Sequence, residues 1–300
     1  MAKFKQKADI HQINFKKEFI TKDSGFYIRD NTEISSPHFL PENYWKNGLN
    51  YVDEFRDEIK TELKEFNNKM RDANMLRSEH IPLNIFVPMV SSLNLTKQLF
   101  NTLLGNDIIE SVLGIHIEMA GGKTKAEYDK KLYLDDGTSF DCRIDFIHKD
   151  GKDGYLGIEV KYTEEEYKIK SDSKEYKDIW KRENNKYQIV TNKSEYYIGD
   201  KYDELKQDKF RQIWRNHILG ASMVHFTKEI DHFYHIHLYP QGNEHFVEII
   251  PKYQELLSEK GRASFLPITY EELFCEMEKL FCENEKHTNW IKYLKARYLF

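Results

Sequence analysis

The chain has 300 residues, 40% of them hydrophobic and 32% charged, which is typical of a folded protein with a polar surface. Its net charge of −5 does not indicate a strongly basic nucleic-acid-binding protein, although a local basic groove is compatible with that total. No apolar run reaches the roughly 20 residues that a membrane-spanning helix requires, and the N-terminus lacks the apolar core of a signal peptide, so we expect a cytoplasmic protein without membrane contact.

The N-terminal third of the chain predicts mainly helices. Residues 1–48 show little periodicity, and the prolines of SPHFLPENYWKNG indicate extended coil or short elements. In residues 50–70, apolar side chains recur at three- and four-residue spacing, which predicts an amphipathic helix with a charged outer face. Residues 93–104 predict another helix. We expect the part over residues 1–75 to be an N-terminal helical extension.

Three strands in succession form the predicted centre of the chain. The first covers residues 111–120, and its alternation places Glu118 on the polar face. The second covers residues 139–148, where charged residues beginning at Asp141 alternate with apolar ones. The turn-forming sequence KDGKD then leads into GYLGIEVKYTE, residues 154–164. These last two runs predict a β-hairpin with both charged faces on the same side.

The second half of the chain alternates helices and strands. Residues 165–204 are polar and weakly patterned, and helical spacing resumes over residues 203–226. The run HFYHIHLYP, residues 232–240, predicts a strand on which His235 and His237 share a face. A zinc ion could bind such a pair, but no third ligand has a suggestive spacing, so we interpret both as structural. The order of elements predicts an α/β fold with a mixed central β-sheet flanked by helices.

The charges within GYLGIEVKYTE indicate chemistry. Glu159 and Lys161 lie on one side of an apolar strand, where charges cost several kcal/mol, on the order of 2–7, unless they are paired or ligated. The preceding strand brings Asp141 to the same face. Two carboxylates can hold Mg²⁺, and a neighbouring lysine can neutralise charge in the transition state. This set suits the hydrolysis of a phosphodiester by in-line attack of a metal-activated water.

The register of the hairpin decides how these groups meet. A five-residue turn predicts Asp141 opposite Lys161 and Arg143 opposite Glu159. Asp141 and Glu159 are then diagonal neighbours, roughly 7–8 Å apart at Cβ, and one metal ion can bridge them. The same pairing also permits an alternative, a purely structural ladder of two cross-strand salt bridges.

The sequence SFDCRIDFIHKDGKDGYLGIEVKYTE resembles the PD-(D/E)XK nuclease superfamily, with its restriction-endonuclease-like core fold. More narrowly, it resembles a bacterial branch of predicted restriction endonucleases with a core like FD…GIEVKYTE. The segments SEHIPLNIFVPM, RQIWRNHILGAS and HLYPQGN are also similar to that branch, so the resemblance spans about residues 40–280. The proline that the family places before the aspartate is absent here, where Phe140 stands.

The resemblance implies the residues of the active site. Asp141 and Glu159 would be ligands of Mg²⁺, for which Mn²⁺ can substitute, and Lys161 would be the catalytic lysine. It also implies a nuclease domain over residues 76–285, followed by a C-terminal helix over residues 286–300.

Supporting residues are also implied. Related nucleases often complete the site with an acidic residue on the first helix, a role for Glu79, and Glu118 on the neighbouring strand is a comparable candidate. Gln212 and Arg215 share a helical face and could contact the metal-bound water or a phosphate; the alternative is an ordinary solvated face. Aromatic and basic residues alternate after the hairpin and could bind nucleic acid or pack as a peripheral helix. The candidate nucleic-acid-binding residues are Lys181, Arg182 and Arg211.

We therefore expect a Mg²⁺-dependent endonuclease that hydrolyses DNA in restriction or phage defence. A homodimer would allow two sites to cut two strands, and RNA is an alternative substrate. The competing hypothesis is a non-catalytic protein with a nuclease fold, either a nucleic-acid-binding module or an interaction component of a defence complex.

Overall fold

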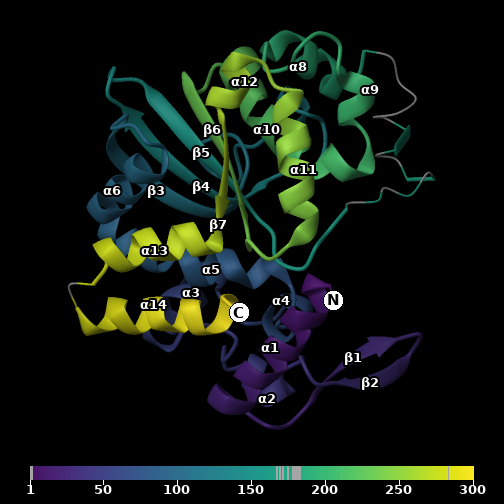
Figure 1. Cartoon of the computed structure of the whole chain (residues 1–300), viewed down its shortest axis with the longest axis vertical. Coiled ribbons are helices and arrows are strands. Elements are labelled where there is room, and N and C mark those ends of the chain that lie inside the picture. The colour runs from purple at the N-terminus through teal and green to yellow at the C-terminus, as the bar shows by residue number, and fades with distance from the viewer. Residues whose placement is uncertain are drawn as a thin grey trace.

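The computed structural model describes residues 3–166, 168, 170, 172–173, 176–177, 184–282 and 284–300. A five-stranded sheet lies at the centre of the molecule, with helices on both of its faces (Figure 1). Its strands, in spatial order, are β3 (Ile109–Met119), β4 (Phe140–His148), β5 (Asp153–Val160), β6 (His232–Tyr239) and β7 (Phe265–Thr269). The first three are antiparallel, and β6 and β7 continue the sheet in parallel with β5. The predicted α/β fold with a mixed sheet is confirmed.

One face of the sheet is covered by helices from both ends of the chain. They are α5 (Ile81–Phe86), α6 (Leu93–Leu103), α13 (Tyr270–Leu280) and α14 (Glu285–Tyr298). The alternate side chains of β4 and β5 that predict this apolar face, among them Ile144 and Ile158, are fully buried beneath them. Helix α13 begins at a capping box, because Thr269 accepts a hydrogen bond from the Glu272 backbone and the Glu272 carboxylate accepts one from Thr269.

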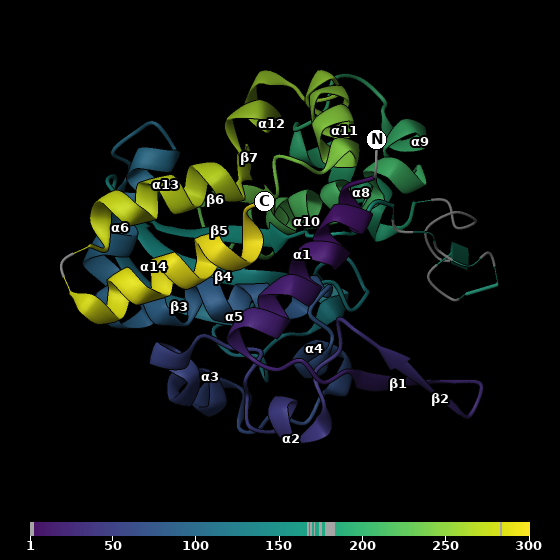
Figure 2. The same cartoon turned by 60° about the horizontal axis from the view of Figure 1, so that its bottom comes forward.

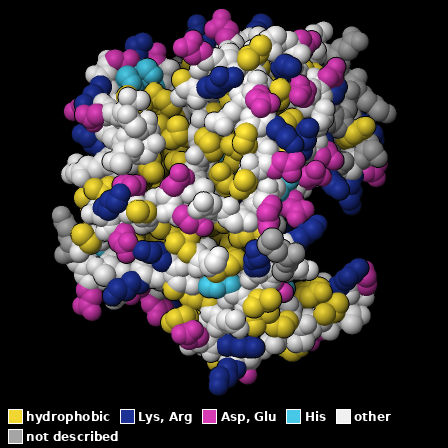
Figure 3. Space-filling view, in the orientation of Figure 1, with side chains coloured by type: hydrophobic (Ala, Val, Ile, Leu, Met, Phe, Trp, Pro, Cys, Tyr) yellow, Lys and Arg dark blue, Asp and Glu magenta, His cyan; other side chains and the backbone are white. Residues whose placement is uncertain are grey.

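The other face lies against the second half of the chain (Figure 2). Its helices are α8 (Lys186–Ser194), α9 (Tyr202–Leu205), α10 (Asp208–Ser222), α11 (Glu244–Glu255) and α12 (Glu259–Ala263). Trp214 and Phe210 of α10 are buried in a second apolar cluster. No helix in the described part of the chain is long and apolar enough to cross a membrane. Acidic and basic side chains are interspersed on the molecular face of Figure 3.

The N-terminal segment is more ordered than its sequence predicts. Residues 1–48, expected to be coil or short elements, contain the 16-residue helix α1 (Phe4–Phe19), besides the hairpin of β1 (Gly25–Arg29) with β2 (Thr32–Ser36) and the short helix α2 (Glu42–Trp45). Helix α1 packs against α14 (Figure 1). The sequence of α1 lacks a clear apolar periodicity because some of its buried positions carry polar residues. Gln12 donates a hydrogen bond to the Tyr162 hydroxyl, and the Lys16 ammonium donates to the Phe39 carbonyl oxygen.

The helix predicted over residues 50–70 is divided in the structure. A 3₁₀ turn at Asp53–Phe55 leads into α3 (Arg56–Leu63). The residue after this helix, Lys64, has a φ of 67°, and α4 follows at Lys69–Ala73. Phe66 is still buried, although it lies beyond the helix. The apolar spacing over residues 50–70 therefore predicted the burial of Phe66 correctly and the length of the helix wrongly.

The domain boundaries after residues 75 and 285 stay predictions.

The register of the β4–β5 hairpin differs from the prediction by two residues. Arg143 faces Gly157 and not Glu159, because the hairpin is closed by a hydrogen bond between the backbones of His148 and Lys152. A shift of two residues keeps every side chain on its predicted face. It removes the alternative of a cross-strand salt-bridge ladder, since Arg143 forms its ion pair with Asp145 on its own strand.

Candidate functional site

Three predicted residues meet where strand β4 begins and strand β5 ends. Extending the observed pairing by one residue beyond Cys142 and Ile158 places Asp141 opposite Glu159. The Asp141 carboxylate accepts a hydrogen bond from the Val160 backbone, 2.7 Å away, so it lies directly against the end of β5. Lys161 follows at once after that strand. The corrected register thus brings Asp141 closer to Glu159 than the predicted diagonal arrangement would.

Glu159 and Lys161 form an ion pair inside the protein. Their side chains are only 7% and 5% exposed, respectively. The side-chain amide of Asn216, on α10, also donates a hydrogen bond to Glu159, with 2.5 Å between Nδ2 and Oε2. The glutamate carboxylate is therefore held from two sides, by the lysine that follows it and by the helix that packs on its strand.

Negative charge predominates in this group. Burial raises the pKa of Asp141 well above its usual value, and repulsion from Glu159 raises it further, despite the opposing effect of Lys161. For Lys161, burial favours the neutral form, but Glu159 and Asp141 outweigh that effect and raise the pKa of the ammonium. The lysine is consequently protonated at neutral pH.

Glu164 is a further carboxylate near the site that the sequence analysis did not single out. Its two oxygens accept hydrogen bonds from the backbones of Tyr162 and Ser78, at 2.8 and 3.3 Å. Its charge contributes to the raised pKa values of both Asp141 and Lys161. The residue ends the very stretch GYLGIEVKYTE, but it lies beyond the strand, where alternation no longer predicts the direction of a side chain.

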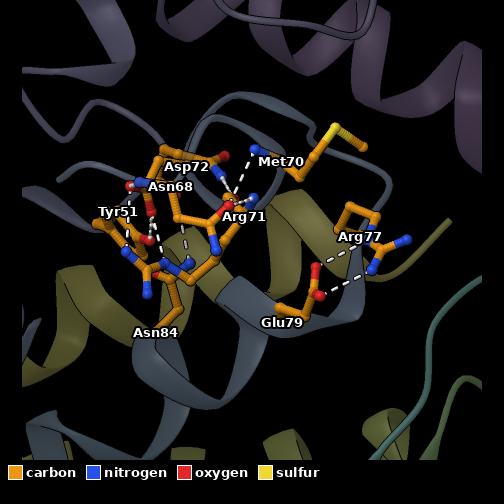
Figure 4. Close-up of polar contacts among 9 residues, drawn as sticks. Tyr51, Asn68, Met70, Arg71, Asp72, Arg77, Glu79 and Asn84 are labelled. Carbon is orange, nitrogen blue, oxygen red and sulfur yellow. Dashed lines mark hydrogen bonds and ion pairs between the residues drawn. The ribbon is translucent and has the colours of Figure 1, made fainter.

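Glu79 lies beside the segment that carries Glu164. It belongs to the 3₁₀ turn Ser78–His80, and its carboxylate forms two hydrogen bonds of 2.7 Å with Arg77. Figure 4 shows this pair apart from the neighbouring cluster that contains Asp72 and Arg71. Glu79 thus has its own counterion in this structure, and its role in completing the site stays a prediction.

Glu118 stands next to Asp141 in the sheet. The neighbouring pair of Ile117 with Cys142 aligns these two acids across β3 and β4. Its side chain is exposed, and its backbone has a φ of 51°, which is uncommon for a residue other than glycine. The alignment is compatible with a supporting role for Glu118, which also stays a prediction.

Helix α10 places its predicted polar residues in different surroundings. The Arg215 guanidinium is 14% exposed and pairs with Asp136 at 2.9 Å and with the Thr138 hydroxyl at 2.7 Å. Both partners lie in the loop that leads into β4. Arg215 therefore fixes this loop, three to five residues before Asp141 as the chain runs.

The structure also locates the other two predicted residues of α10. Arg211 is only 2% exposed, and its guanidinium donates to Asp208 and to the backbone oxygen of Lys206, so it is not placed on an open surface. Gln212 is half-buried one turn before Asn216. Lys181 and Arg182 lie outside the described residues.

The two histidines of β6, which the sequence analysis interprets as structural, lie inside the protein. His235 and His237 are fully buried, and burial lowers the pKa of each; that of His235 falls to about 3. His237 is the direct neighbour of Glu159 across the parallel pair of β5 and β6. A neutral imidazole therefore adjoins the site and adds no positive charge to it.

The donor set of the site fits a hard divalent cation. Asp141 and Glu159 offer carboxylate oxygens, the ligands that Mg²⁺ prefers, and Glu164 adds negative charge nearby. Desolvation raises the pKa of Asp141 most, and repulsion from Glu159 raises it further. A cation held between Asp141 and Glu159 would relieve that repulsion.

A comparison with protein families gives one match. A family model described as the PD-(D/E)XK nuclease superfamily matches residues 2–300, which is nearly the whole chain. No curated protein and no solved structure matched the chain.

Proposed function

This chain belongs to the PD-(D/E)XK nuclease superfamily, and we propose that it is a divalent-metal-dependent endonuclease that hydrolyses DNA, with Asp141, Glu159 and Lys161 as its catalytic residues. The superfamily supports a hydrolase of phosphodiester bonds in general. The observation that supports these three residues is the convergence of two carboxylates with a buried, protonated lysine at the ends of β4 and β5.

Mg²⁺ is the proposed cofactor, and Mn²⁺ should substitute for it. Asp141 and Glu159 would hold the ion. When bound, a divalent ion lowers the pKa of a coordinated water and stabilises negative charge on a phosphate. The protein contributes the two carboxylates in a fixed arrangement, because Asp141 is hydrogen-bonded to the Val160 backbone and Glu159 to Asn216.

Lys161 is proposed to act on the phosphate. Its ammonium keeps its proton because Glu159 and Asp141 raise its pKa. It can therefore neutralise charge that develops on a non-bridging phosphate oxygen in the transition state. Its contact with Glu159 places the ammonium directly beside the proposed metal site. Removing it should lower the rate of the chemical step much more than the affinity for DNA.

Cleavage of supercoiled plasmid in the presence of Mg²⁺ tests the proposal. The wild type is compared with Lys161→Met and with the control Lys252→Met, which changes a half-exposed lysine of α11 that pairs with Glu248. We expect nicked or linear products with the wild type and the control, and a loss of at least about 100-fold with Lys161→Met. Full cleavage by Lys161→Met would place the active site elsewhere.

DNA and a role in restriction or phage defence are proposed because of the sequence resemblance to predicted restriction endonucleases. RNA oligonucleotides assayed in parallel distinguish the two substrates. A homodimer with two sites would cut both strands. Analytical ultracentrifugation of the same protein preparation measures whether the chain forms a dimer. Binding of nucleic acid without cleavage of any substrate would support the competing non-catalytic module.

A further inference from the structure

A second group of metal-binding side chains lies at the far end of the β4–β5 hairpin. It consists of His148, the last residue of β4, Asp150 in the turn, and His232, the first residue of β6. Asp141 and His148 are seven steps apart along β4, or roughly 23 Å at the usual rise of a strand. The group is therefore distinct from the proposed catalytic site.

The three side chains converge on one point. The Asp150 carboxylate lies 2.9 Å from Nδ1 of His148 through one oxygen and 2.8 Å from Nε2 of His232 through the other. The two imidazole rings stack with their centres 3.8 Å apart and their planes 20° from parallel. One ligand atom from each residue lies within 4.8 Å of the other two. Small side-chain rotations bring such atoms into a single coordination shell.

We propose that His148, Asp150 and His232 bind a transition-metal ion of the Zn²⁺ class. Two imidazole nitrogens with one carboxylate form a donor set that Zn²⁺ and its neighbours in the first transition series bind well. Mg²⁺ and Ca²⁺ prefer shells made of oxygen, so this site and the proposed catalytic site should select different ions.

The turn holds its ligands in place before any ion binds. Gly151 adopts a φ of 84°, which glycine permits, and its backbone donates to the His148 carbonyl oxygen, which closes a tight turn that contains Asp150. The backbone of Lys152 donates a hydrogen bond to the Asp150 carboxylate at 3.1 Å. The backbone of Asp150 itself donates to Nδ1 of His148 at 3.2 Å, a contact that holds the ring against the turn.

Local charge also favours a cation at this position. The Asp150 carboxylate lies between the two imidazole rings and accepts a hydrogen bond from the Lys152 backbone. The two lysines of the turn are paired with other acids, Lys149 with Asp107 and Lys152 with Asp231. Their positive charges are thereby partly neutralised next to the site.

An ion bound here would join two segments that are distant in sequence. His148 and Asp150 belong to the hairpin turn, and His232 begins the strand that runs parallel to β5. The ion would fix the turn to the start of β6. Binding to the folded state alone raises the free energy of unfolding, so addition of Zn²⁺ should raise the melting temperature.

Calorimetric titration of the full-length chain with Zn²⁺ tests the proposal. The Asp141→Asn variant serves as the reference, because it disables the other metal site. We expect this reference to bind one ion and His232→Ala, made in the same background, to bind at least about tenfold more weakly. Equal affinity in the two proteins would overturn the proposal, and so would the absence of binding in the reference.

Nuclear magnetic resonance of the imidazole nitrogens provides a test that needs no substitution in the site. Zn²⁺ added to the Asp141→Asn reference should shift one ring nitrogen of His148 and one of His232, and should leave those of the buried His217 unchanged. Shifts confined to other histidines would contradict the assignment, whether or not His232→Ala folds. The result does not depend on nuclease activity, so the site can exist even if the catalytic proposal fails.

Discussion

Asn216 of helix α10 donates its side-chain amide to the carboxylate of Glu159 on strand β5, with 2.5 Å between the two atoms. Both residues are buried, at 3% and 6% exposure. A hydrogen bond to a charged, buried group contributes about 1.5–3 kcal/mol, so this contact fixes the orientation of the glutamate strongly. It connects the helix that covers the sheet with the proposed metal ligand.

Asn216→Ala should therefore weaken the proposed metal site. We expect the Mg²⁺ concentration for half-maximal cleavage to rise about tenfold or more, because Glu159 loses the contact that orients it. Lys209→Ala is the control, a half-buried lysine two turns earlier on the same helix that is not among the proposed site residues. The measurement is the cleavage rate against Mg²⁺ concentration; an unchanged midpoint in Asn216→Ala would show that the amide has only a structural role.

Asp141→Asn should abolish activity without destabilising the metal-free protein. The carboxylate is half-buried beside Glu159, and desolvation and repulsion from Glu159 raise its pKa, so its charged form is unfavourable in the fold. Asparagine keeps an acceptor for the Val160 backbone and removes the repulsion. We expect a cleavage rate at least about 100-fold lower and a free energy of unfolding that is unchanged or up to about 1 kcal/mol higher. Thermal unfolding in EDTA measures the stability.

Asp136→Asn is the contrasting variant for that experiment. Burial would raise the pKa of Asp136, but its ion pair with Arg215 and its hydrogen bond with Tyr187 lower it overall. This charge therefore stabilises the fold, and its loss should cost about 1–3 kcal/mol. A stability loss in Asp141→Asn as large as that in Asp136→Asn would argue that Asp141 is structural.

Arg215→Met should act on stability through the loop that leads into β4. The substitution leaves Asp136 buried without its main counterion, which we expect to cost about 3 kcal/mol. Combining it with Asp136→Asn should recover part of that loss, because no uncompensated charge remains. A double-mutant cycle, measured by denaturant unfolding, gives the coupling energy between Arg215 and Asp136. If the two losses in the free energy of unfolding were strictly additive, the ion pair would contribute nothing to stability.

The free energy of unfolding should fall as the pH drops below about 6.5, the value at which an exposed histidine titrates. His80, His217, His235 and His237 are fully buried, and burial lowers the pKa of each. The unfolded chain therefore binds more protons than the folded chain between pH 6.5 and 5. Each histidine contributes up to about 1.4 kcal/mol per pH unit in that range.

His237→Phe isolates one of these contributions. Neither ring nitrogen of His237 has a hydrogen-bond partner among the described residues, and its ring packs 4.9 Å from that of Phe246. We expect the free energy of unfolding at pH 8 to be unchanged or higher. Between pH 6.5 and 5, it should fall less steeply with decreasing pH, because about one proton fewer is taken up on unfolding. Unfolding curves at pH 5, 6.5 and 8 measure it. An unaltered slope would show that His237 is protonated in the folded state.

The sequence analysis predicted that Asp141, Glu159 and Lys161 share a face because a period of two predicts side-chain direction within a strand. It could not fix the register, because the geometry of the turn between His148 and Lys152 decides which residues pair. The two-residue error kept Asp141 on its predicted face and changed its partner from Lys161 to Glu159.

Residues that reach the site from helices and loops were harder to predict. Asn216 follows Arg215 in the segment RQIWRNHILGAS, but the helical spacing alone favoured Gln212 with Arg215 and gave no reason to select the buried amide. Helix α1 was missed for a related reason, since its buried Gln12 and Lys16 interrupt the apolar pattern. Buried polar contacts depend on distant partners, which local periodicity does not report.

The dependence of plasmid cleavage on divalent metal, in the wild type and in Glu159→Gln, tests the central claim most directly. Glutamine keeps the shape of Glu159 and removes the charge that the proposed ion requires. We predict that the wild type cleaves with Mg²⁺ or Mn²⁺, stops in EDTA and recovers when Mg²⁺ is restored, whereas Glu159→Gln is inactive throughout. Cleavage by the wild type in EDTA, or full cleavage by Glu159→Gln with Mg²⁺, would contradict a metal site made by Asp141 and Glu159.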